Sequence, residues 1–112
     1  MRLIAMIFAF MVGACASHEA NSADRDTERG HAIAQAHCST CHAIGLAGES
    51  SAPEAPPFRT LSENYRVQTL EEALAEGISV GHPAMPAFAF DPEDVDALIA
   101  YLQSIQQAEP AS

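Results

Sequence analysis

The sequence predicts an all-α fold in a single small domain. Apolar residues recur at helical spacing near the C-terminus, no stretch alternates apolar and polar residues as a strand does, and glycines and prolines gather between the helical stretches. Among the 112 residues there are only seven aromatic side chains, two Tyr and five Phe, and no Trp. Domains with so small a core often depend on a cofactor, a metal or disulfides.

The first 14 residues, MRLIAMIFAFMVGA, have the layout of a bacterial secretion signal. Arg2 precedes an apolar run of ten residues, Leu3 to Val12, and small residues follow it. A helix needs about 20 apolar residues to span a bilayer, so we expect residues 1–14 to be a signal rather than a membrane span. Export predicts a periplasmic protein in a compartment that permits disulfides.

Cys15 ends the stretch VGAC, which resembles the lipobox of bacterial lipoproteins. Lipidation at Cys15 would tether the protein to the membrane. Ordinary cleavage after the Ala14–Ala16 pattern or after Ala23 would discard this cysteine, and both interpretations remain open. Residues 15–23 are small and polar, and we expect them to form a flexible tether.

The exported part of the chain is strongly acidic. All 15 acidic residues follow the signal, whereas Arg2, one of the five basic residues, lies within it, so the exported part carries a formal charge of −11 and no lysine. Such a charge argues against nucleic acid or anionic lipid as a docking surface and favours redox partners with basic docking surfaces. Solubility alone would also explain it.

Two longer helices are expected near the ends of the exported domain, which we place at residues 24–107, before a disordered tail at 108–112. The first helix covers 24–37, where an acidic residue can cap a run of good helix formers. The last begins with Asp91 as cap and Pro92 at the first helical position. Its apolar face is predicted to hold Val95, Leu98, Ile99, Leu102 and Ile105.

The stretch between them is expected to be mostly irregular. Glycines and prolines fill residues 43–60, and a loop of this length in a small domain usually wraps something. Thr69 and Glu72 fit a capping box and predict a short helix that ends near Gly77.

The motif CSTCH, residues 38–42, carries the chemistry. A zinc site needs four ligands, and no second pair of Cys or His at similar spacing follows. A thioredoxin-type dithiol follows a strand, and none is predicted. Covalent haem attachment uses two thiols about one helical turn apart and a histidine next to the second, which Cys38, Cys41 and His42 provide.

With this motif the chain resembles the class I c-type cytochromes over residues 24–107. The features that match the family's order are Gly30, the motif, Pro56 in APPF, the pair Met85 and Pro86, and IAYL at 99–102. The resemblance implies three or more helices around one covalently bound haem c, with a carbonyl of Pro56 or else Pro57 hydrogen-bonded to His42. It also implies that Gly30 and Tyr101 lie where the first and last helices cross.

The residue that binds the iron opposite His42 decides the function. Outside the signal Met85 is the one methionine, and a thioether there raises the reduction potential and closes the iron to small molecules. His82 is the alternative ligand. We expect Phe58, Phe88 and Phe90 in the haem crevice or core, and His31 and His37 at the surface.

The resemblance implies a one-electron carrier between redox proteins that is not an enzyme. A haem c relay subunit of a dehydrogenase or oxidase complex is the first alternative, and a sensor or peroxidase without a Met85 ligand is the second. The absence of lysine sets this chain apart from the basic mitochondrial carriers, so their partners are not inferred for it.

Overall fold

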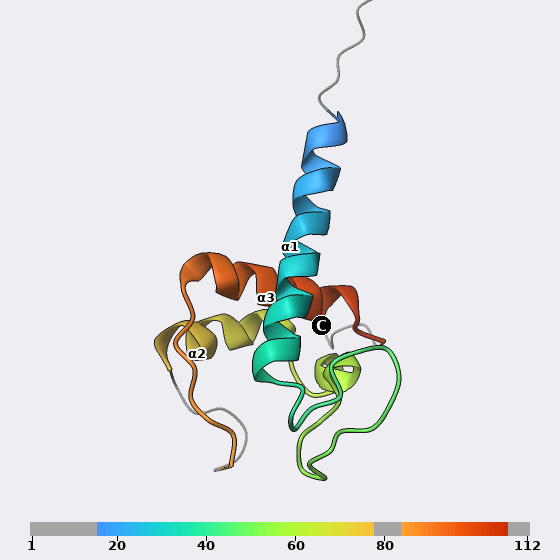
Figure 1. The fold of residues 1–112 in the computed structure, drawn as a ribbon, viewed down its shortest axis with the longest axis vertical. Coiled ribbons are helices and arrows are strands. Elements are labelled where there is room, and N and C mark those ends of the chain that lie inside the picture. The colour runs from blue at the N-terminus through green and yellow to red at the C-terminus, as the bar shows by residue number, and fades with distance from the viewer. Residues whose placement is uncertain (1–15, 78–83, 108–112) are drawn as a thin grey trace, which may run out of the picture.

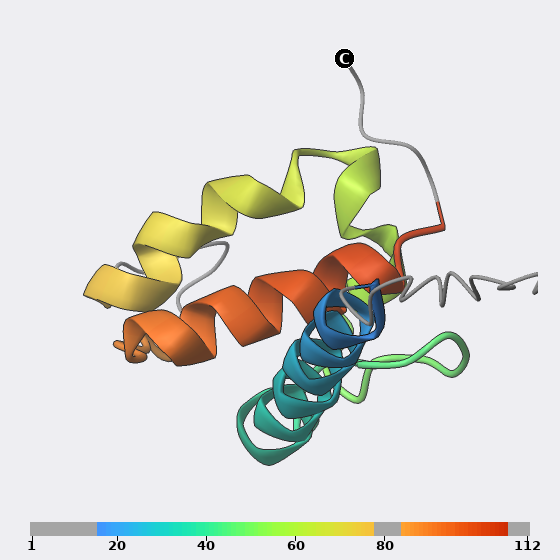
Figure 2. The ribbon, with the colours of Figure 1, turned by 90° about the horizontal axis from the view of Figure 1, so that it is seen from above.

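Helices form all the regular structure in the residues that the computed structural model describes, 16–77 and 84–107 (Figures 1 and 2). The elements in chain order are α1 (Ala16–His37), the 3₁₀-helices η1 (Phe58–Glu63) and η2 (Val67–Thr69), α2 (Leu70–Glu76) and α3 (Pro92–Ser104). The predicted all-α class is confirmed. None of these described helices is long and apolar enough to cross a bilayer. The signal, Cys15, His82 and the tail 108–112 lie outside the described residues.

Helix α1 begins earlier than predicted. It starts at Ala16 rather than Asp24, so residues 16–23, which we expected to belong to a flexible tether, are helical. No glycine or proline stands between Ala16 and Arg29, and nothing in the local sequence therefore interrupts the helix. In Figure 1 this first part of α1 projects beyond the other helices.

Helices α1 and α3 cross at Gly30, as the resemblance implied. A Cβ atom built on Gly30 would overlap the backbone carbonyl oxygen of Ala97 and lie 2.6 Å from the Cβ of Tyr101. Any side chain at this position would push the two backbones apart. Figure 2, which looks along α1, shows α3 running across it.

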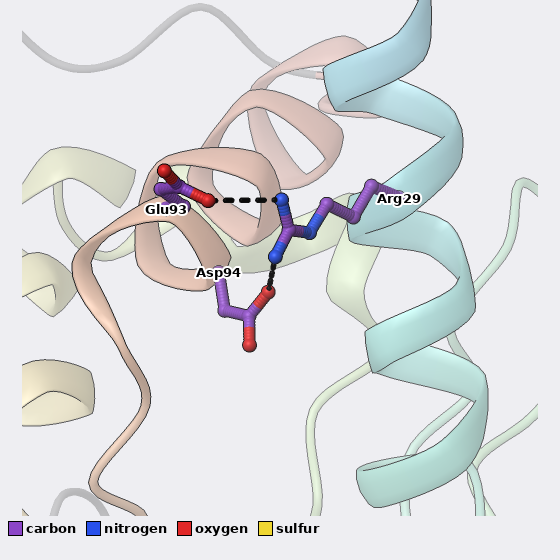
Figure 3. Close-up of polar contacts among 3 residues, drawn as sticks. All are labelled: Arg29, Glu93 and Asp94. Carbon is purple, nitrogen blue, oxygen red and sulfur yellow. Dashed lines mark hydrogen bonds and ion pairs between the residues drawn. The ribbon is translucent and has the colours of Figure 1, made fainter.

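An exposed cluster of charges joins the same two helices one residue before the crossing (Figure 3). The guanidinium of Arg29 lies 2.6 Å from Asp94 Oδ1 and 3.5 Å from Glu93 Oε2. The hydrogen bond and charge of Asp94 raise the pKa of Arg29. Solvent screens exposed ion pairs, so these contacts add little to the stability of the fold. We infer that they help to orient α1 on α3.

The core lies along one face of α3. All five residues predicted for that face are buried, at 7% exposure or less, and they pack against Ala34 of α1 and Leu74 of α2. Asp91 occupies the N-cap position with Pro92 following it, but the Asp91 carboxylate makes no capping hydrogen bond.

The predicted capping box of α2 is wrong. Thr69 has helical dihedral angles because η2 leads directly into α2, and its hydroxyl donates to the Arg66 carbonyl oxygen at 2.6 Å. The predicted end is confirmed, since Gly77 closes α2 in the left-handed conformation with φ +75°.

Candidate functional site

The CSTCH motif continues the direction of α1 as one further turn. The amide of Cys38 donates to Ala34 O at 2.8 Å, and the amide of His42 donates to Cys38 O at 3.0 Å. The two thiols therefore stand one turn apart, with His42 directly behind the second. Both thiols are free; Cys38 is half-buried and Cys41 is exposed. Burial raises the pKa of Cys38 to about 11.

The imidazole of His42 is held by the early loop. Its Nδ1 lies 2.8 Å from the carbonyl oxygen of Pro56, and because a carbonyl only accepts, Nδ1 carries the proton. The neutral ring then has its lone pair on Nε2, free for a metal. The ring of Phe58 packs 4.9 Å from that of His42 at 44°, and the Phe58 amide donates to Ala43 O at 2.9 Å. Of the two prolines considered, it is Pro56 that the structure brings to His42.

An apolar crevice opens beside this imidazole. It has two parts of about 630 Å³ and about 950 Å³, which share Cys38, His42, Met85 and Phe88 in their walls. The rest of the first part is lined by Pro56, Phe58, Leu61, Tyr65, Leu70, Leu74, Leu98 and Leu102. The second reaches Cys41, His37 and Ala55, with Glu54 as its one charged wall residue.

The aromatic residues predicted for this region are found there. Phe58 is buried in the core, Phe88 lines the crevice, and Phe90 packs against the core with its ring stacked on Phe88 at 5.3 Å. His31 and His37 are exposed as predicted, although the His37 ring also contacts Phe90 at 5.4 Å.

The residues present fit a haem. The crevice wall combines two thiols, the oriented imidazole of His42 and one thioether with a largely apolar lining. A second feature also suits this group: Nη1 of Arg59, in η1, is buried without a hydrogen-bond partner among the described residues, and haem carries two propionate carboxylates. A zinc site finds no support, since the described residues hold no cluster of three or more His, Cys, Asp or Glu able to bind a metal ion.

Several residues of the crevice were missed from the sequence. Leu70 and Leu74 of α2 both line the crevice, and their spacing of four, which puts them on one face of a helix, is the signal that could have found them. Tyr65, 41% exposed, lies between η1 and η2 and carries no sequence signal for this position. Outside the crevice, the side chain of Gln106 contacts η1, and this contact was also not predicted.

Comparison with known protein families gives a match over most of the chain. Residues 25–102 match the model of the family described as Cytochrome C oxidase, cbb3-type, subunit III. No curated protein and no solved structure matches the chain.

Proposed function

The chain belongs to this family of c-type cytochrome domains, and on that premise we propose that it is a periplasmic monohaem carrier of single electrons between redox proteins, without substrate turnover of its own. Haem-based electron transfer is the work of cytochrome c domains. The observation that carries the proposal is the His42 imidazole, held by Pro56 O with Nε2 free, at a crevice whose wall also contains Cys38 and Met85.

Each side chain of the crevice has a role in this proposal. Cys38 and Cys41 would hold haem c through two thioether bonds, and His42 Nε2 and the Met85 sulfur would bind its iron. When bound, the haem supplies an iron centre that gains or loses one electron. Pro56 O accepts from Nδ1, which fixes the tautomer of His42 and makes its Nε2 a stronger donor.

The choice of an electron carrier rather than an enzyme depends on Met85 as the iron ligand opposite His42. If Met85 binds the iron, no coordination position would be open for a small molecule, and the largely apolar lining would keep water from the site. The polypeptide would then set only the reduction potential of the haem and offer a docking surface to redox partners.

For that surface we propose partners with basic docking sites. A shallow groove between α2 and α3 is walled by Glu71, Glu72, Glu76 and Asp96, and its charge complements such a partner. Association rates that do not fall as ionic strength rises would contradict this.

The proposal places residues 1–14 in a signal and 24–107 in the haem domain of a periplasmic protein, with Cys15 either lipidated as a membrane anchor or removed by cleavage. The alternative is a haem c relay subunit of a dehydrogenase or oxidase complex. The family's description as an oxidase subunit is the observation that supports it. Purification under mild detergent distinguishes them: a carrier is recovered alone, and a relay subunit is recovered with the complex.

The direct test of haem attachment replaces Cys38 and Cys41 by alanine, singly and together. We expect the intact protein to have the mass of chain plus one haem after denaturation, and the double variant to lose the haem and to be largely unfolded, because the crevice side chains lose their common partner. Ser39→Ala, between the cysteines and exposed, is the control. A cooperative, well-folded double variant would contradict the proposal.

A further inference from the structure

The side-chain amide of Gln106 joins the end of α3 to η1. Its Nε2 donates to the carbonyl oxygens of Phe58 and Leu102, each at 2.7 Å, and its Oε1 accepts from the Ser62 amide at 2.9 Å. Gln106 therefore holds both the first turn and the fifth residue of η1 against the last turn of α3. The backbone adds one further contact beside it, from the Gln107 amide to Arg59 O at 3.0 Å.

The start of η1 is also where the chain meets His42. Phe58 follows Pro56 by two residues, its ring packs on the His42 ring at 4.9 Å, and its amide donates to Ala43 O. Pro57 lies between Pro56 and Phe58 with φ −58°, and its ring prevents rotation about its own N–Cα bond. A displacement of Phe58 is therefore transmitted to the Pro56 carbonyl, the acceptor for His42 Nδ1.

We propose that Gln106 is a positioning residue for the His42 imidazole, which it reaches through Phe58 and Pro56. The first turn of a 3₁₀-helix is a weak anchor by itself, since such helices are short and have poor hydrogen-bond geometry. With three hydrogen bonds from a half-buried amide, η1 is fixed to α3, and the Pro56 carbonyl keeps its direction toward Nδ1. The inference rests on the proposed role of His42 as an axial ligand.

The test compares Gln106→Leu and Gln106→Glu with Gln103→Leu, an exposed glutamine of α3, in the holoprotein. The glutamate keeps an acceptor for the Ser62 amide but loses the donor to Phe58 O, so it tests the donor half if the leucine variant fails to fold. The measurements are the NMR exchange rate of the His42 Nδ1 proton in the ferrous state and the reduction potential. A structural defect elsewhere would move neither.

We expect both Gln106 variants to exchange the Nδ1 proton about tenfold faster than the unaltered protein, because the hydrogen bond to Pro56 O opens more often. The potential should rise in Gln106→Leu, since a weaker hydrogen bond makes His42 a poorer donor to ferric iron. The charge added in Gln106→Glu lowers the potential by itself, so that variant is judged by proton exchange alone. Gln103→Leu should change neither value.

Two results would overturn the inference in distinguishable ways. If the His42 ring protons of the unaltered protein lack the large shifts of a haem ligand, the proposed function fails and the inference fails with it. If those shifts are present but proton exchange in both Gln106 variants and the potential of Gln106→Leu equal those of Gln103→Leu, the assignment of His42 stands and the inference alone is wrong.

Discussion

Replacement of Gly30 by alanine tests how the two long helices pack. A new Cβ would overlap Ala97 O and lie 2.6 Å from Tyr101 Cβ, closer than carbon atoms approach without bonding. Neither obstacle is the flexible end of a side chain, so α1 and α3 must separate at their crossing. We therefore expect Gly30→Ala to destabilise the domain.

The size of the effect follows from two opposing contributions. Overpacking a close contact costs about 1–3 kcal/mol, and a clash with backbone belongs at the upper end. Alanine is the better helix former by about 1 kcal/mol, which offsets part of that cost. The net loss is about 2 kcal/mol, which for a domain of this size lowers the melting temperature by about 8–16 °C.

Thermal unfolding of the holoprotein, followed by circular dichroism, measures this loss, and two other glycines supply matched controls. A Cβ on Gly45 meets nothing within 4 Å, so Gly45→Ala should leave stability within about 0.5 kcal/mol. Gly48 is equally open but has φ +93°, so Gly48→Ala should cost about 1 kcal/mol through backbone strain alone. Equal melting temperatures for the Gly30 and Gly45 variants would refute the close crossing.

Two further predictions concern Tyr101 and Cys15. Tyr101→Phe removes the hydrogen bond from the buried hydroxyl to Ile44 O, 2.6 Å long, and should cost about 1–2 kcal/mol in denaturant unfolding at neutral pH. Burial raises the pKa of Tyr101, so the stabilisation from its hydroxyl is present below the ordinary tyrosine pKa near 10 and is lost as pH rises beyond it. If Tyr101→Phe costs the same free energy of unfolding at pH 7 and at pH 12, the role assigned to the hydroxyl is contradicted. Cys15→Ser should release a lipidated protein from the membrane fraction or stall its processing. A mature N-terminus at Ser17 or Asp24 in mass spectrometry would exclude the anchor.

Features set by local pattern were predictable from the sequence. The apolar spacing from Val95 to Ile105 identified the buried face of α3, because a surface helix packs on the core through its apolar side. The resemblance to c-type cytochromes correctly placed Gly30 against Tyr101, a contact between residues 71 positions apart that no local pattern encodes.

Features set by tertiary contacts were not predictable. The 3₁₀-helices η1 and η2 lie in a stretch without periodicity, and η1 is held from outside by Gln106. The capping box failed because η2 places Thr69 in a helical conformation, where its hydroxyl bonds to Arg66 O instead. The start of α1 was misplaced because small polar residues suit a tether and a helix alike. At the site, local spacing identified Cys38, Cys41 and His42, whereas Tyr65 reaches the crevice only through the fold.

Near-infrared absorption of the ferric protein tests most directly whether Met85 binds the iron opposite His42, on which the proposed carrier function depends most. A thioether on ferric haem gives a weak sulfur-to-iron charge-transfer band in that region. We predict the band in the unaltered protein and in His82→Ala, and its loss in Met85→Ala, together with a lower potential and ready binding of cyanide or carbon monoxide. Absence of the band from the unaltered protein, or its loss in His82→Ala, would contradict the assignment of Met85 and with it the interpretation of this chain as an electron carrier.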